Sequence, residues 1–107
     1  MLLLLIALLT GSVPTHAAEP APLAIEVSGA YLPDRLTVRA GEPIHLVFTR
    51  TTWDGCTREV VFPSLGLRKE LPTGQPTPVD LPPQPPGEIV FLCGMGMIRG
   101  TLVVEAP

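Results

Sequence analysis

Fourteen prolines and ten glycines punctuate this chain of 107 residues. They leave no stretch with the apolar repeat of roughly 3.6 residues that marks a long helix. Between them lie short runs rich in β-branched and aromatic residues. Runs of this kind, bounded by proline and glycine, are typical of β-strands. We therefore expect an all-β protein without long helices.

The short runs predict a set of strands that covers most of the chain after residue 22. Seven or eight such strands with regular turn signals indicate a Greek-key β-sandwich. The expected strands are Leu23–Val27, Arg35–Arg39, Ile44–Thr49, Glu59–Phe62, Leu67–Leu71, Pro78–Leu81, Glu88–Cys93 and Thr101–Glu105.

Alternation along these runs predicts which side chains face the core. In residues 44–49 every second residue, from Ile44 on, is apolar and is expected to point inward. Ile89, Phe91 and Cys93 share one face of the penultimate strand, so Cys93 enters the following loop from a fixed side. The proline-dense stretch 75–87 is expected to form an edge strand and a turn, because proline is tolerated at sheet edges.

The first ten residues are almost entirely leucine, isoleucine and alanine. This run is shorter than the roughly 20 apolar residues of a membrane helix, but it has the length of a signal-peptide core. Residues 11–14 break it, and small residues before Glu19 offer a cleavage site after Ala17 or Ala18. No Lys or Arg precedes the run, so its positive charge would come from the α-amino group or from a start further upstream.

We therefore expect a signal peptide at 1–18, a single domain at 19–107, and a periplasmic or extracellular location. In an oxidising compartment two cysteines most often form a disulfide. The net charge is −3, and the charged residues do not gather in a basic patch. We therefore expect no nucleic-acid partner and no strong membrane binding. His45 is the only histidine after the predicted signal. Since it leaves few candidates for general base chemistry and no catalytic set appears, we expect no enzyme activity.

Sulfur atoms after the signal gather in two places. Cys56 lies in one loop-like stretch, and Cys93, Met95 and Met97 form a Cys-Gly-Met-Gly-Met run. Thiolate and thioether ligands together favour Cu(I) over hard cations, which prefer oxygen. The glycines between them tolerate backbone angles closed to other residues, so the run can curl around one point. This pattern predicts a Cu(I) site formed by the four sulfurs.

The order of several short segments resembles that of the cupredoxin-like domain, over about residues 24 to 105. These segments are 29–33, 38–43, 48–50, Cys56, 60–63, 71–72, 86–88, 91–97 and 100–104. More narrowly, the chain is similar to the cupredoxin domain of the CupA-type Cu(I) chaperones. Those proteins bind Cu(I) with a cysteine between middle strands and a Cys-x-Met-x-Met loop near the C-terminus.

The resemblance implies a solvent-accessible two-copper site with thiolates able to bridge, held by Cys56, Cys93, Met95 and Met97. We expect one or two Cu(I) ions. It implies a copper chaperone or buffer that exchanges copper with a donor or acceptor such as an exporter or a metalloenzyme. We expect this protein to be a monomer. CupA-type proteins carry a membrane anchor, whereas this sequence has only the signal-like run. A free exported form is therefore expected, unless a start further upstream adds an anchor.

Three other functions remain open from the sequence. One is assembly of a cytochrome oxidase copper centre, which shares the copper chemistry and differs only in the acceptor. A blue-copper electron carrier needs two imidazoles, and this chain has no histidine after His45. A metal-free interaction domain would use Cys56 and Cys93 as a structural disulfide.

Several residues near Cys56 each have two candidate roles. Trp53 is interpreted as a lid over the metal or as a rim residue, and the rim is favoured. Arg50, Asp54 and Arg58 could contact the ligands or a partner, but they are expected to be solvated turn charges.

Overall fold

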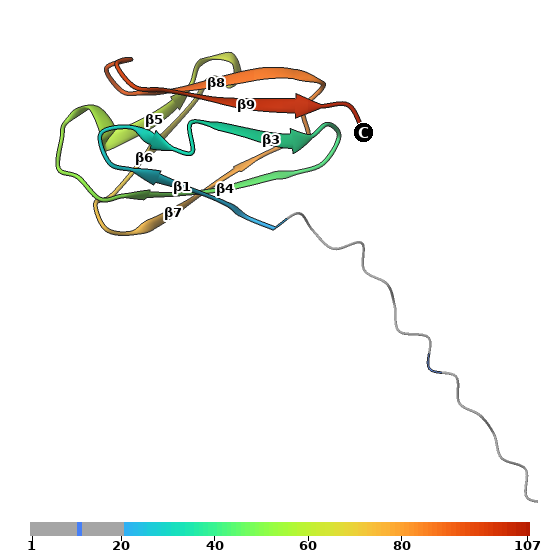
Figure 1. Cartoon of the computed structure of the whole chain (residues 1–107), viewed down its shortest axis with the longest axis horizontal. Coiled ribbons are helices and arrows are strands. Elements are labelled where there is room, and N and C mark those ends of the chain that lie inside the picture. The colour runs from blue at the N-terminus through green and yellow to red at the C-terminus, as the bar shows by residue number, and fades with distance from the viewer. Residues whose placement is uncertain (1–10, 12–20) are drawn as a thin grey trace, which may run out of the picture.

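The computed structural model describes residue 11 and residues 21–107, and this part of the chain forms a β-sandwich (Figure 1). The predicted signal segment 1–18 lies, apart from Gly11, outside the described residues. Among the described residues no helix has the length and hydropathy needed to span a membrane. The elements are β1 Leu23–Val27, β2 Tyr31–Leu32, β3 Arg35–Arg39, β4 Ile44–Arg50, η1 Cys56–Arg58, β5 Glu59–Phe62, η2 Pro63–Leu65, β6 Leu67–Glu70, β7 Pro76–Leu81, β8 Gly87–Cys93 and β9 Arg99–Glu105.

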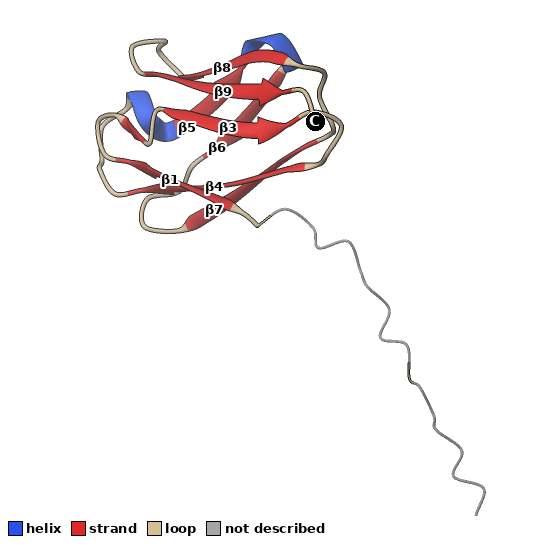
Figure 2. Ribbon diagram, turned by 45° about the vertical axis from the view of Figure 1, so that its right-hand side comes forward, coloured by secondary structure: helices blue, strands red, loops and turns tan. Residues whose placement is uncertain are grey.

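Two mixed sheets make up the sandwich. One has the strand order β2-β1-β4-β7, and the other has the order β3-β9-β8-β5-β6. The strands β1 and β4 pair in parallel, as do β3 and β9, while the other pairs are antiparallel. Two single-turn 3-10 segments, blue in Figure 2, flank β5. The predicted all-β Greek-key sandwich is confirmed.

The eight predicted strands are all present, with boundaries that differ by at most two residues. The strand β7 lies at the edge of its sheet, as its prolines predicted. The strand β2 was not predicted, because two residues are too short to show an alternating pattern. It exists because Tyr31 pairs with Val27 across the turn from β1.

Aromatic rings fill the space between the sheets. The Phe91 ring lies 4.8 Å from Tyr31, 5.6 Å from Phe48 and 5.6 Å from Phe62, measured between ring centroids. All four side chains are buried. The predicted inward face of β4 is confirmed, since every second residue from Ile44 to Arg50 is buried. Phe91 is therefore the centre of the core, two residues before Cys93 on the same face of β8.

Candidate metal centre

Cys93 is the last residue of β8 and is only 2% exposed. The alternation of the strand places it on the core face with Ile89 and Phe91, as predicted. Its Sγ accepts hydrogen bonds from the backbone N–H groups of Met97 at 3.3 Å and Ile98 at 3.4 Å. The chain after β8 therefore wraps around this sulfur, which fixes its position.

Cys56 begins η1, in the connection between β4 and β5, and is partly exposed. Its sulfur is joined to that of Cys93 in a disulfide, and the two Cα atoms are 5.5 Å apart. The Gly94 N–H also donates to the Cys56 carbonyl at 3.0 Å, which links the two loops. The structure thus brings together the two cysteines that the sequence singled out, and it joins them in a disulfide that the sequence had left undecided.

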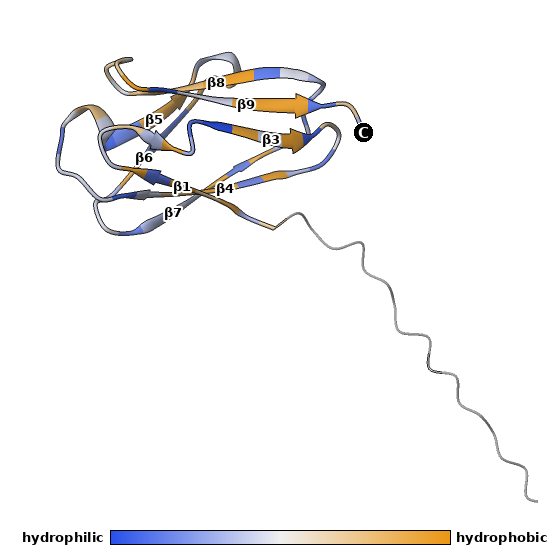
Figure 3. Cartoon of the chain, viewed as in Figure 1, coloured by the Kyte–Doolittle hydropathy of each residue, from blue (hydrophilic) through white to orange (hydrophobic). Residues whose placement is uncertain are grey.

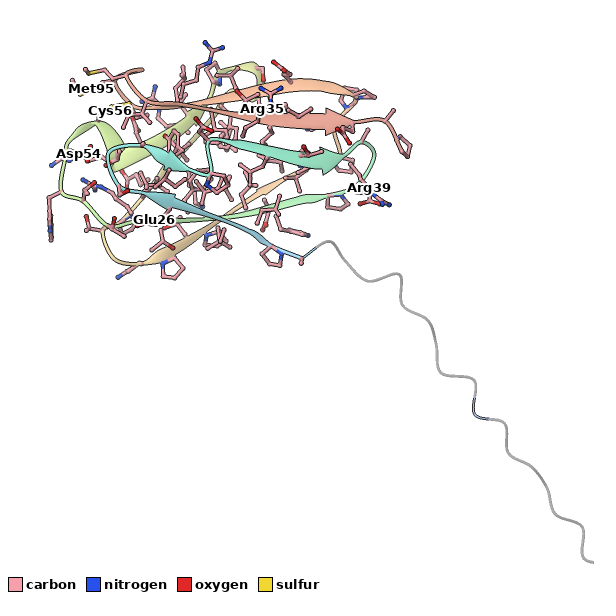
Figure 4. The ribbon with its side chains drawn as sticks, in the orientation of Figure 1. Glu26, Arg35, Arg39, Asp54, Cys56 and Met95 are labelled. Carbon is pink, nitrogen blue, oxygen red and sulfur yellow. A yellow bond between two sulfur atoms is a disulfide. The ribbon has the colours of Figure 1, made fainter. Side chains whose placement is uncertain are left out.

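The turn between β8 and β9 carries both methionines at the surface. Met95 is 68% exposed and Met97 is 78% exposed. Gly96 adopts a φ of 73°, which favours glycine, and its N–H donates to the Cys93 carbonyl at 2.9 Å. The turn is coloured as hydrophobic in Figure 3, and Figure 4 places Met95 near Cys56. All four predicted ligands therefore lie at one end of the sandwich, and their role as ligands stays a prediction.

Gly94 has a different role from Gly96. A Cβ at this position would lie 2.7 Å from Glu59 Oε1. Glu59 is in turn paired with Arg68 on the neighbouring strand. A side chain at position 94 would therefore displace this ion pair from beside the turn.

Arg50 is the main correction to the expectations for this site. It was expected to be a solvated turn charge, but it is 6% exposed. Its guanidinium donates to the Thr57 hydroxyl at 3.0 Å, to the Asp54 carbonyl at 2.6 Å and to the Leu71 carbonyl at 3.3 Å. These bonds offset the cost of burying the charge. Arg50 thus fastens the loop that carries Cys56 to the end of β4.

Asp54 is exposed, as expected of a solvated turn charge, but its carboxylate is also part of the same network. Its carboxylate accepts hydrogen bonds from the Thr52 hydroxyl at 2.6 Å, the Thr57 hydroxyl at 2.9 Å and the Thr57 N–H at 3.1 Å. The bond from Thr52, followed by those from Thr57 and the nearby Arg50 charge, holds the pKa of Asp54 below its ordinary value. Arg58 is also exposed, as expected.

The lowered pKa of Asp54 predicts an acid-dependent contribution to stability. The native carboxylate binds its proton less readily than the unfolded one, so the contribution is full above the unfolded pKa of about 3.9 and is lost as pH falls through the native value. We expect the Asp54→Ala variant to be less stable at neutral pH and the difference from wild type to narrow below about pH 4. Denaturant unfolding of the oxidised, metal-free proteins at several pH values measures this, and a constant difference would contradict it.

The other residues raised by the sequence lie at or beyond the rim. Trp53 is 86% exposed, which agrees with a rim position in the metal-free chain, and its role near a bound metal stays a prediction. A groove of about 630 Å³ runs beside Met95 and is also lined by Arg58, Glu59 and Glu70. This groove borders the turn on the side of β5 and β6.

His45 lies away from the sulfur atoms. Its Nδ1 is 2.8 Å from Asp80 Oδ1, and it lines a groove together with Arg39. Figure 4 shows Arg39 at the opposite end of the sandwich from Cys56 and Met95. In residues 11 and 21–107 no group of three or more His, Cys, Asp or Glu side chains is placed to hold a metal ion. Among the described residues, this end of the sandwich therefore presents sulfur atoms and no imidazole.

Comparison with known proteins identifies relatives over most of the chain. A family model of the cupredoxin-like domain matches residues 1–104. The metal-binding domain of the Cu(I)-exporting P-type ATPase CopA of Streptococcus pneumoniae, solved with Cu(I), is 26% identical with a TM-score of 0.75. The match covers 78% of this chain and 84% of that one. A search of curated proteins gives no significant match.

Two further solved structures share the fold. A copper binding protein, solved by NMR in the apo form, is 34% identical with a TM-score of 0.74, over 78% of this chain and 86% of that one. A reduced amicyanin variant is 18% identical with a TM-score of 0.57, over 78% of this chain and 82% of that one, and it supports the fold alone. The family match and the 34% identical relative agree with the sandwich and with its segment order. The chain belongs to the cupredoxin-like domain family.

Proposed function

We propose that this protein binds Cu(I) and serves as an exported copper chaperone or buffer. The observation that carries the proposal is the meeting of Cys56 and Cys93 at the end of the sandwich where Met95 and Met97 are exposed. Two of the similar solved structures are described as a copper binding protein and as a metal-binding domain with Cu(I). These likenesses support a copper-related function for this chain.

The donor set fits Cu(I) once the disulfide is reduced. Thiolates from Cys56 and Cys93 and thioethers from Met95 and Met97 are soft ligands that favour Cu(I). The thioethers do not titrate, so they remain available as ligands at any pH. One or two ions fit this set, because each thiolate can bridge.

Exposure of the methionines supports transfer by ligand exchange. Met95 and Met97 extend from the turn into solvent, whereas Cys93 is buried beneath it. An incoming thiolate or thioether from a partner can therefore reach copper before the first protein ligand leaves. The partners we propose are a copper donor and a copper acceptor in the periplasm or outside the cell, such as an exporter or a metalloenzyme. We propose that the chain acts on them as a monomer and without enzyme activity.

Replacing both methionines tests the thioether role. The double variant Met95→Leu and Met97→Leu keeps the size and apolar character of the side chains. We expect the Cu(I) affinity of the reduced protein to fall by at least about 10-fold, the smallest loss typical of a residue that only supports a ligand, since two thioethers are removed while both thiolates remain. Competition with a coloured Cu(I) chelator measures this, with each single variant as a control for the share of each thioether. An unchanged Cu(I) affinity would show that neither methionine is a copper ligand.

A blue-copper electron carrier is the main alternative, and addition of Cu(II) separates it from the proposal. Among the described residues only His45 offers an imidazole, and it lies at the other end of the sandwich. Since Cu(II) in such centres is held by two imidazoles and a thiolate, we expect no intense blue or red colour when Cu(II) is added to the reduced protein. An intense, stable colour would support electron transfer instead.

A further inference from the structure

The disulfide between Cys56 and Cys93 is asymmetric in its exposure. Cys93 is 2% exposed, and Cys56 is partly exposed in the loop before β5. Thiol–disulfide exchange requires a thiolate to reach one of the two sulfurs. Access therefore favours attack at Cys56 and leaves Cys93 as the sulfur that departs.

Hydrogen bonding to the sulfurs also favours attack at Cys56 and departure of Cys93. The backbone N–H groups of Met97 and Ile98 both donate to Cys93 Sγ. Among the described residues no other hydrogen bond reaches either of the two sulfurs. When the disulfide is cleaved at Cys56, the negative charge develops on Cys93, where two donors already point at it. Cleavage in the opposite sense would place the charge on Cys56 without these donors.

The two cysteines also lie in different parts of the fold. Cys93 ends β8, which pairs with β5 and β9 on its two sides. Cys56 lies in the connection that follows β4, where the bonds of Arg50 hold its neighbours Asp54 and Thr57. A reaction at Cys56 thus disturbs a loop, whereas a reaction at Cys93 would disturb the core.

We propose that this disulfide is a substrate for a dithiol reductase, which attacks at Cys56 and thereby opens the metal centre. This inference deepens the proposed function, on which its biological purpose rests, and it names a thiol partner distinct from the copper partners. The groove beside Met95 is also lined by Gly55, so a partner seated in it would lie next to the segment that carries Cys56.

The reaction balances as two successive exchanges. A thiolate of the reductase forms a bond to Cys56 Sγ, the Cys56–Cys93 bond breaks, and Cys93 leaves as a thiolate. The second thiol of the reductase, after losing its proton, then forms a bond to the first reductase sulfur and releases Cys56. The reductase is oxidised to its own disulfide, and this protein gains two electrons. Both cysteines are then available as thiolates for Cu(I).

The order of attack can be read directly by trapping the first exchange. The oxidised, metal-free full chain is mixed with reduced glutathione and quenched rapidly with an alkylating reagent, and the two cysteines are mapped by peptide mass spectrometry. We expect glutathione on Cys56 and alkylation on Cys93, in at least about a tenfold excess over the reverse product. Equal labelling, glutathione mainly on Cys93, or a disulfide that glutathione leaves intact would overturn the proposal.

A second trap uses a thioredoxin-like reductase whose second active-site cysteine is replaced by serine, so that the mixed disulfide persists. We expect this complex to form through Cys56, and a complex through Cys93 or no complex would again overturn the proposal. Neither trap contains copper. If the traps contradict the order of attack, the proposed Cu(I) site of the chemically reduced protein still stands. If the reduced protein does not bind Cu(I), the order of thiol exchange still stands.

Discussion

The Cys93→Ser variant is expected to lose at least about 100-fold in Cu(I) affinity, more than the 10-fold to 100-fold typical of residues that only support a ligand. Cys93 Sγ lies at the end of the core face of β8 and is held by the N–H groups of Met97 and Ile98. Serine keeps the shape of the side chain but supplies a hard oxygen in place of a soft thiolate. The variant is expected to keep the fold and to lose the thiolate that the proposed site places at its centre.

The measurement is competition with a coloured Cu(I) chelator under reducing, oxygen-free conditions. The comparison is with reduced wild type, so that loss of the disulfide is common to both samples. Cys56→Ser is the matched variant and is expected to show a loss of similar size. An affinity that remains within a few-fold of wild type in Cys93→Ser would show that copper, if bound, is held elsewhere.

The Phe91→Ala variant is expected to lower the free energy of unfolding by about 3–5 kcal/mol, the usual cost of deleting a buried aromatic ring. Phe91 is fully buried and its ring contacts those of Tyr31, Phe48 and Phe62. Removing it leaves a cavity at the centre of the sandwich, two residues from Cys93. For a domain of this size, such a loss is a large part of the total stability.

Leu92→Ala provides the control for this prediction, because Leu92 is on the same strand but on its other face and is only half-buried. We expect Leu92→Ala to lower the free energy of unfolding by less than half as much as Phe91→Ala. Denaturant unfolding of both oxidised variants measures the difference. Equal losses for the two substitutions would show that the aromatic cluster does not dominate the core.

Most of the fold could be predicted from the sequence because its strands are short, alternating and bounded by proline and glycine. The strand β2 was missed because its pairing depends on contacts across a turn and not on a repeat of its own. The predicted strand was two residues shorter than β7, because Pro76 was expected to precede it. It belongs to the strand because β7 is an edge, where a missing N–H costs little.

The candidate site could be predicted only in part. The clustering of sulfur pointed to Cys56, Cys93, Met95 and Met97, and the structure places them at one end of the sandwich. The burial of Arg50 was missed, because an arginine followed by polar residues is typical of a solvated turn. The signal was the alternation of β4, which places Arg50 on the inward face with Phe48. Its partner at Leu71 lies 21 residues further on and could not be recognised from local sequence.

The most direct test of the account is a Cu(I) titration of the reduced, signal-less chain under argon, in competition with a coloured Cu(I) chelator. The account predicts tight binding of about one or two equivalents through the four sulfurs, and loss of this binding when the disulfide is left intact. A reduced protein that takes no copper from the chelator would contradict it. Cys56 and Cys93 would then be a structural disulfide in a metal-free interaction domain.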